Sequence, residues 1–122
     1  STRRIRRIEA PRLGRREIFD RAPVNRIQIS EEALQDLNEG FLFYEAQQIG
    51  LGDYFVSSLR SDIERLRIAG GSHRIVFEDY HRLICKVFPF AVYYTHDFEH
   101  VIVWAVIDQR RDPAWIREHL TK

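Results

Sequence analysis

The hydrophobic periodicity of the chain changes once, near residue 73, and this change constrains the fold more than any other feature. Between residues 31 and 69, apolar side chains recur every three or four positions, as on one face of a helix. From residue 73 to residue 107 they recur in short runs rich in Val, Ile, Phe and Tyr, as in strands. Helices followed by strands predict an α+β domain.

The helical segment divides into two amphipathic helices, over residues 31–48 and 54–69. Ser30 is a suitable N-cap for the first, Gly50 is the expected end of that helix, and Asp53 is the expected N-cap of the second. Because the connecting loop is short, the helices should form an antiparallel hairpin. Their apolar stripes consist of Leu34, Leu37, Phe41, Tyr44 and Gln48 in the first helix, and Phe55, Leu59, Ile63 and Leu66 in the second.

Strands are predicted before and after the hairpin. Asp112 followed by Pro113 is a strong start signal for a short terminal helix over residues 113–121. Neighbouring strands joined by tight turns pair antiparallel, so the second half should form a twisted antiparallel sheet. In one of these strands Arg82 and Lys86 fall on the same face, about 13 Å apart at roughly 3.3 Å per residue. The predicted strands cover residues 24–30, 73–78, 81–88, 90–96 and 100–107.

Charge is unevenly distributed, although the net charge is only +1. Residues 1–26 hold nine arginines against three carboxylates, whereas the other 96 residues carry a net charge of −5. We therefore expect an arginine-rich arm over residues 1–23 and one folded domain over residues 24–122. The arm is suited to binding a phosphate-bearing or acidic partner. Alternatively, it lays its few apolar side chains on the domain and leaves its arginines in water.

Composition excludes several classes of protein. No apolar run approaches the roughly 18 residues of a membrane span, and no signal-peptide apolar region is present, so a soluble, cytoplasmic protein is expected. The single cysteine, Cys85, excludes an internal disulfide and is expected in the core. His96 and His100, close to Asp97 and Glu99, lack the further Cys or His pair of a zinc motif, so neither a metal site nor a cofactor is predicted.

Two adjacent tyrosines, Tyr93 and Tyr94, lie in the middle of a predicted strand. Successive side chains of a strand point to opposite faces. One of the two is therefore expected in the core and the other exposed for a partner.

The order of the predicted elements, together with the run FPFAVYYTHDFEHVIVWAVIDQRRDP at residues 88–113, resembles the RelE/ParE superfamily of bacterial toxins. The resemblance is greatest to the ParE, or plasmid stabilisation, branch of type II toxin–antitoxin systems. It covers the chain from Val24 to Leu120 and leaves the arm unmatched. It implies a toxin neutralised by a co-expressed antitoxin that wraps around it. Asp108 is a departure, because many relatives of this branch carry His there.

The resemblance leaves two targets open, since ParE-like members inhibit DNA gyrase whereas RelE-like members cut messenger RNA on the ribosome without metal. Metal-free RNA cleavage requires a base, an acid and cations around the phosphate. RelE-type sites contain a crowd of Lys, Arg and Tyr or His, but here the lysines are only Lys86 and Lys122, and Asp108 would repel a phosphate. Gyrase is therefore the preferred target, the ribosome and its mRNA are the alternative, and a non-toxic relic that still binds a regulator is a third possibility.

Two groups of residues are predicted to bind partners, and no catalytic residue is assigned. The cations suited to an acidic surface of the target are Arg82, Lys86, Arg110 and Arg111. Structural alternatives are open for all four: edge-strand charges that block aggregation for the first two, and ion pairs that fix the strand-to-helix turn for the last two. Of the turn arginines, one is expected to be structural and the other to bind a partner. The apolar residues outside the helix stripes, expected to bind the antitoxin, are Leu42, Phe43, Ile49 and Leu51.

Overall fold

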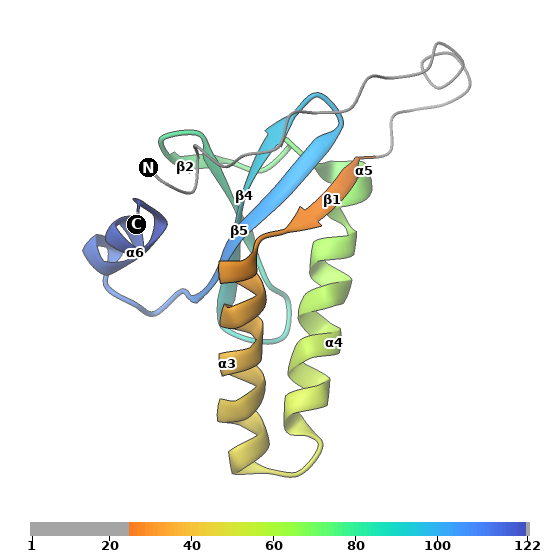
Figure 1. Ribbon diagram of the computed structural model, residues 1–122, viewed down its shortest axis with the longest axis vertical. Helices are drawn as coiled ribbons and strands as arrows, with labels where there is room; N and C mark the ends of the chain where they lie inside the picture. Colours follow the sequence, from red (N-terminus) through yellow and green to blue (C-terminus); the bar gives the residue numbers. More distant parts are fainter. Residues whose placement is uncertain (1–24, 122) are drawn as a thin grey trace.

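The computed structural model of the chain describes residues 25–121, so the predicted arm lies outside the described residues. This part has the predicted α+β architecture: a strand, a helix hairpin, a twisted sheet and a short terminal helix. Figure 1 shows the hairpin and the terminal helix on different sides of the sheet. The elements are β1 (Arg26–Ile29), α3 (Glu31–Gln47), α4 (Leu51–Glu64), α5 (Leu66–Ala69), β2 (Ile75–Phe77), β3 (Tyr80–Ile84), β4 (Phe90–Asp97), β5 (His100–Asp108) and α6 (Pro113–Thr121).

The sheet is mixed, with the strand order β1-β5-β4-β3-β2. The four strands that follow the hairpin pair antiparallel, as their tight connections predict. β1 lies at the edge and runs parallel to β5, with Arg26 opposite His100 and Ile29 opposite Val103. A parallel pair needs a long crossover. The α3–α4 hairpin and three strands lie between these partners in the sequence.

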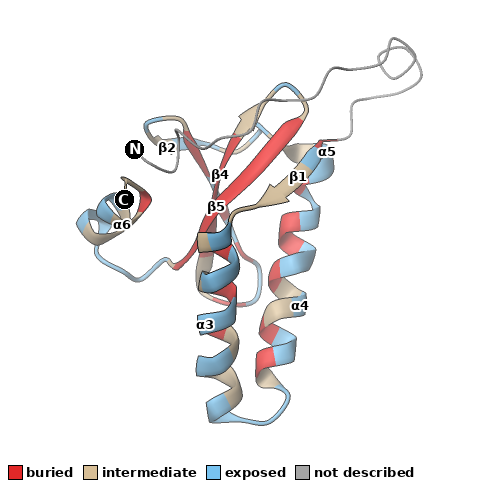
Figure 2. Ribbon diagram, in the orientation of Figure 1, coloured by how far each residue is buried: buried red, intermediate tan, exposed pale blue. Residues whose placement is uncertain are grey.

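Both faces of the sheet are buried, which corrects one expectation (Figure 2). Tyr94 belongs to the core beneath the hairpin, and Tyr93 belongs to a second core beneath α6. The two tyrosines point to opposite faces as predicted. The expectation that one of them is exposed is wrong, because Tyr93 is 2% exposed and Tyr94 is 0% exposed. The reason is that Leu120 of α6 packs on the second face and completes its core.

The hairpin forms as predicted, but its helix boundaries differ. Gly50 is not the end of the first helix, because the C-cap of α3 is Gln48 and Gly50 directly precedes α4. The single second helix predicted over residues 54–69 is divided at Arg65 into α4 and α5.

The N-caps agree with the prediction in one helix only. The Ser30 hydroxyl accepts the Ala33 N–H at 3.0 Å, as an N-cap does. Asp53 is not the N-cap of the second helix, because α4 already begins at Leu51. Instead, the Glu45 carboxylate of α3 accepts hydrogen bonds from the backbone N–H groups of Gly50 and Gly52 at the start of α4. It thereby satisfies N–H groups that would otherwise need an N-cap side chain.

The predicted apolar stripe is confirmed in the second helix of the hairpin, across α4 and α5, and only in part in α3. Every stripe residue of the second helix is buried. In α3, however, Leu34 is 45% exposed, and the buried positions are Ala33, Leu37 and Gly40. The helices approach so closely at Gly40 that small residues occupy part of the contact face. The predicted stripe of α3 is therefore correct at Leu37 and at Tyr44, which packs against the core, and wrong at Leu34.

Strand β3 is shorter than predicted, and this separates Arg82 from Lys86. β3 ends at Ile84, so only Arg82 lies on the strand. The chain turns before Pro89: the Cys85 N–H bonds to Phe90 O at 2.9 Å, and the Lys86 N–H bonds to the Asp62 carboxylate at 3.3 Å. The predicted alignment of the two cations along one strand is wrong, because a helix carboxylate holds the backbone away from a strand partner.

The terminal helix has the predicted start. The Asp112 side chain accepts the Ala114 N–H at 3.2 Å, and Pro113 is the first helical residue. Cys85 is buried in the hairpin-side core as expected, and burial raises the pKa of its thiol to about 12. Within residues 25–121, no helix has the length and apolar character needed to cross a membrane.

Candidate functional site

A cleft opens between α3 and α6 where β5 ends, with a cavity volume of about 310 Å³. The chain passes from β5 to α6 along the rim of this cleft, and one of the two adjacent arginines in that connection, Arg111, lines the cleft. Helix α3 forms one wall, the end of β5 the floor, and α6 with its entry turn the other wall. The lining residues are Asp36, Glu39, Gly40, Phe43, Tyr44, Phe90, Val106, Ile107, Asp108, Arg111, Trp115 and His119.

Arg110 is held in a structural ion pair at the rim. Its guanidinium donates to both carboxylate oxygens of Asp108, at 2.9 and 2.6 Å, and its backbone N–H bonds to the same side chain. The Arg110 hydrogen bond holds the pKa of Asp108 below its ordinary value, so this carboxylate is charged at neutral pH. The pair fixes the exit from β5, and Asp108 acts there as an anchor for the turn.

Arg111 has a different environment, and it faces the cleft. Its guanidinium carbon lies 4.2 Å from the centre of the Trp115 ring, in a cation–π contact. Trp115 in turn stacks on His119, with ring centres 4.8 Å apart. No carboxylate of the described residues lies within ion-pair distance of Arg111. An exposed guanidinium that is ordered by stacking can bind an anionic group of a partner.

The inner end of the cleft is polar. Asp36 of α3 accepts the Val106 N–H at 2.9 Å, which ties the helix to β5. The second Asp36 oxygen is 3.7 Å from His119 Nε2, too far for a hydrogen bond. That nitrogen is buried and has no hydrogen-bond partner among the described residues. Burial also raises the pKa of Tyr44, which lines the same wall.

The four predicted target-binding cations do not form one cluster. Arg111 lines the cleft and Arg110 adjoins it. Arg82 is exposed on β3, opposite Tyr93, and Lys86 is exposed in the turn after β3. The structure therefore assigns Arg110 to the turn by its ion pair, leaves Arg111 open to a ligand, and places the other two outside the cleft lining.

The predicted antitoxin-binding residues lie in the last turns of α3, in the loop that follows it and at the start of α4. Figure 1 shows the connection between α3 and α4 at the end of the hairpin farthest from the sheet. Three of them are exposed: Leu42 by 57%, Phe43 by 58% and Ile49 by 92%. Leu51 is partly buried against the main core. Phe43 also lines the cleft, so exposed apolar surface continues from the hairpin tip towards Arg111.

Several residues of this region were not singled out from the sequence. Tyr54 is 52% exposed near the hairpin tip, and its position next to the stripe residue Phe55 was the available signal. Asp36 and His119 gave no such signal, because their partners lie far away in the chain. The contact of Trp115 with Arg111 depends on the turn between them, which no local sequence pattern indicates.

The tyrosine and histidine side chains of β3 and β4 that could serve in acid–base chemistry make structural contacts instead. The Tyr80 hydroxyl donates to Leu120 O at 3.1 Å, and His81 Nδ1 lies 2.7 Å from His73 O, an acceptor. Tyr94 is buried beside His73, with its hydroxyl 2.7 Å from that ring. These side chains hold the sheet together and do not converge with Arg111.

His96 and His100 also have separate partners. His96 Nε2 lies 2.8 Å from Asn25 Oδ1, and His100 Nε2 lies 2.9 Å from Gln28 Oε1. Among the residues the structure describes, no three His, Cys, Asp or Glu side chains are grouped so as to hold a metal ion.

Comparisons with known proteins bear on the fold. No protein-family model matches the chain. No curated protein matches it in sequence. Among solved structures, a chain described as "Chromosomal ParDE TA system from P. aeruginosa" is similar, with a TM-score of 0.63 and 13% sequence identity. The match covers 70% of this chain and 96% of that chain. At this identity the similarity shows that this protein has the ParE-like fold expected from the sequence.

Proposed function

We propose that this chain is the toxin of a bacterial toxin–antitoxin pair, neutralised by a cognate antitoxin, and that it inhibits growth by binding DNA gyrase as ParE-like toxins do. The observation that carries the proposal is the fold shared with a chain of a ParDE toxin–antitoxin system over 70% of this protein. The exposed apolar hairpin tip and the adjoining cleft offer a surface to the antitoxin.

The site chemistry favours binding over RNA cleavage. An acidic side chain, Asp108, occupies the strand end and binds Arg110, so neither group is available to a scissile phosphate. Tyr80 and His81 are buried and bonded to backbone carbonyls. Arg111, stacked and exposed, can bind an acidic surface without any proton transfer.

The target is tested with purified protein in two assays, gyrase-catalysed supercoiling and ribosomal translation of a defined message. The proposal requires inhibited supercoiling and an intact message. Codon-dependent cleavage of the message with normal supercoiling would establish the RelE-like alternative. Activity in neither assay, together with no growth inhibition on induction, would identify a non-toxic relic.

The role of Arg111 in target binding is tested by charge reversal. Arg111→Glu should weaken gyrase inhibition by at least tenfold, because it places a carboxylate where the proposal needs a cation. Arg117→Glu is the matched control, since Arg117 is exposed on α6 and does not line the cleft. Unchanged unfolding midpoints would show that both variants fold. Equal inhibition by the two variants would remove Arg111 from the target site.

The antitoxin surface is tested by co-purification with the product of the adjacent reading frame. Phe43→Asp should weaken the complex by about 10- to 100-fold, the loss typical of a central apolar contact. Ile68→Asp is the matched control, because Ile68 is also an exposed apolar side chain but lies on α5, at the other end of α4. Equal effects of the two variants would place the antitoxin elsewhere.

A further inference from the structure

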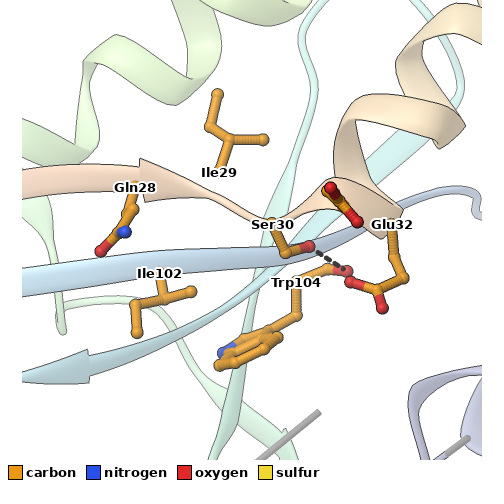
Figure 3. A pocket seen from close by; sticks show the side chains of 7 residues that line it. Gln28, Ile29, Ser30, Glu32, Ile102 and Trp104 are labelled. Carbon is orange, nitrogen blue, oxygen red and sulfur yellow. Dashed lines mark hydrogen bonds between the residues drawn. The ribbon is translucent and has the colours of Figure 1, made fainter. Parts of the chain in front are cut away.

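A second pocket, also of about 310 Å³, opens at the C-terminal end of β1. Figure 3 shows the side chains of Gln28, Ile102 and Trp104 on one side of the strands and Ile29 on the other. The Ser30 hydroxyl donates to Trp104 O at 3.2 Å and closes one end. The pocket has an apolar floor from β5 and an acidic rim from the first turn of α3; its lining residues are Gln28, Ile29, Ser30, Glu31, Glu32, Ile102 and Trp104.

The position of this pocket is defined by the sheet edge. Ile102 and Trp104 belong to the core beneath α6, but no residue of α6 lines the pocket. Because β1 is an edge strand, the pocket can be reached from outside the sheet. Asn25, where the described chain begins, is the residue immediately before β1. Residues 1–24 therefore join the described chain just before the first residue of β1, and the other end of this strand borders the pocket.

The N-terminal arm and the rest of the chain carry opposite net charges. Residues 25–121 hold ten Lys or Arg and fifteen Asp or Glu, a net charge of −5. Residues 1–24 hold eight Arg and three Asp or Glu, a net charge of +5. The pocket rim carries the adjacent carboxylates Glu31 and Glu32. Opposite charge on a covalently attached segment favours an intramolecular occupant over one from solution.

We propose that the arm docks in this pocket through residues 14–19, GRREIF. Ile18 and Phe19 fill the apolar floor, and the guanidinium groups of Arg15 and Arg16 pair with the acidic rim. The segment runs antiparallel to β1. In this direction Ile18 and Phe19 lie over the apolar floor, and Arg15 and Arg16 lie at the acidic rim beside the start of α3. The inference does not depend on the proposed toxin function.

Chain length favours this segment over the rest of the arm. From Asn25 to Gln28 the strand covers about 10 Å, and the six residue steps from Asn25 back to Phe19 span up to about 20 Å, which leaves enough chain for a turn around the strand edge. Pro23 lies inside this connection and restricts it. The other basic run, residues 3–8, must close a longer loop and loses more conformational entropy.

The proposal is tested by NMR on the full chain with a nitroxide label at Ala10→Cys. Cys85 is buried, and its pKa of about 12 leaves little thiolate, so the label reacts at the added cysteine. The readout is the indole Nε1–H signal of Trp104, which donates to Thr95 Oγ1 at 2.8 Å. Trp115 carries the other indole of the chain, so the two signals are readily resolved.

We expect the label to reduce the Trp104 signal by roughly half or more at low salt, and the signal to recover in about 0.5 M NaCl as the ion pairs are screened. The double variant Glu31→Gln/Glu32→Gln should reduce this broadening at least twofold. Glu39→Gln, on the same helix but outside this pocket, is the matched control and should leave it unchanged.

Substitution of both apolar residues, Ile18→Ser/Phe19→Ser, tests the floor contact and should abolish the broadening at every salt concentration. An unbroadened Trp104 signal in the otherwise native chain would overturn the proposal and leave the pocket to a separate partner. Broadening that persists in both the Glu31→Gln/Glu32→Gln variant and the Ile18→Ser/Phe19→Ser variant would also overturn the proposal. It would show that the arm lies close to β1 but outside the pocket.

Discussion

Replacing Gly40 with alanine should destabilise the helix hairpin, although alanine is the better helix former. A Cβ at this position would lie 2.4 Å from two ring carbons of Phe55, closer than any normal contact. The Phe55 ring cannot move away easily, because it is fully buried. Its centre lies 5.0 to 5.2 Å from the rings of Tyr44, Phe88 and Phe90.

Two opposing terms set the size of the effect. Alanine favours an α-helix over glycine by about 1 kcal/mol. Overpacking a buried contact costs about 1–3 kcal/mol, and a 2.4 Å approach to an immobile ring belongs near the upper end. The Gly40→Ala variant should therefore lose about 1–2 kcal/mol in its free energy of unfolding, which lowers the Tm by roughly 5–10 °C for a domain of this size.

The assay is urea unfolding followed by circular dichroism, with two further variants. Asn38→Ala is the matched control, because Asn38 is exposed on the same helix and should gain a few tenths of a kcal/mol from propensity alone. In a Phe55→Leu background the clash is relieved, so Gly40→Ala should cost at least about 1 kcal/mol less than in the native background. If Gly40→Ala is as stable as the native chain, or costs the same in both backgrounds, the close approach does not limit the hairpin.

The remaining predictions concern buried polar groups. Burial lowers the pKa of His73 and of His96, so the unfolded chain binds more protons than the folded chain at acidic pH. The contribution of these two groups to stability is therefore complete above about pH 6.5 and decreases as the pH falls below that value. The urea midpoint of unfolding should accordingly be lower at about pH 5 than at about pH 7. A midpoint that is unchanged or higher at the lower pH would contradict this sign. Asp62, 4% exposed, bonds Arg65 at 2.7 Å and the Lys86 N–H at 3.3 Å, so Asp62→Ala should cost about 1–3 kcal/mol and expose the turn after β3 to faster amide exchange. Amide exchange that is unaltered in this turn would show that the carboxylate does not hold it.

The local patterns of the sequence were sufficient for the elements themselves. The apolar stripe of α4, the Ser30 cap and the Asp112–Pro113 helix start all depend on residues a few positions apart, and all are present in the structure. The same holds for antiparallel pairing after the hairpin, because a tight turn leaves two neighbouring strands no other arrangement. The resemblance to ParE-like toxins rested on this order of elements, and the fold agrees with it.

The candidate site was only partly predictable. The sequence indicated that one arginine of the pair would be structural and one open to a partner, and the ion pair of Arg110 with Asp108 accounts for the structural one. It could not show that Arg111 stacks on Trp115 beside a cleft, since the far wall of that cleft belongs to α3. Nor could it show that Lys86 leaves the strand, because the responsible carboxylate, Asp62, lies 24 positions earlier.

Sequence by itself therefore determined the types of the elements, their order and most of their boundaries, because helix and strand periods and caps act over a few residues. Only the tertiary structure decided which strand pairs with β1, which face of the sheet α6 covers, and which polar groups meet in the cleft. Each of these depends on residues far apart in the chain, as in the Asp36 bond to Val106 across 70 positions. Such contacts form because they satisfy buried donors and cover apolar surface, and the patterns along a single segment do not contain that information.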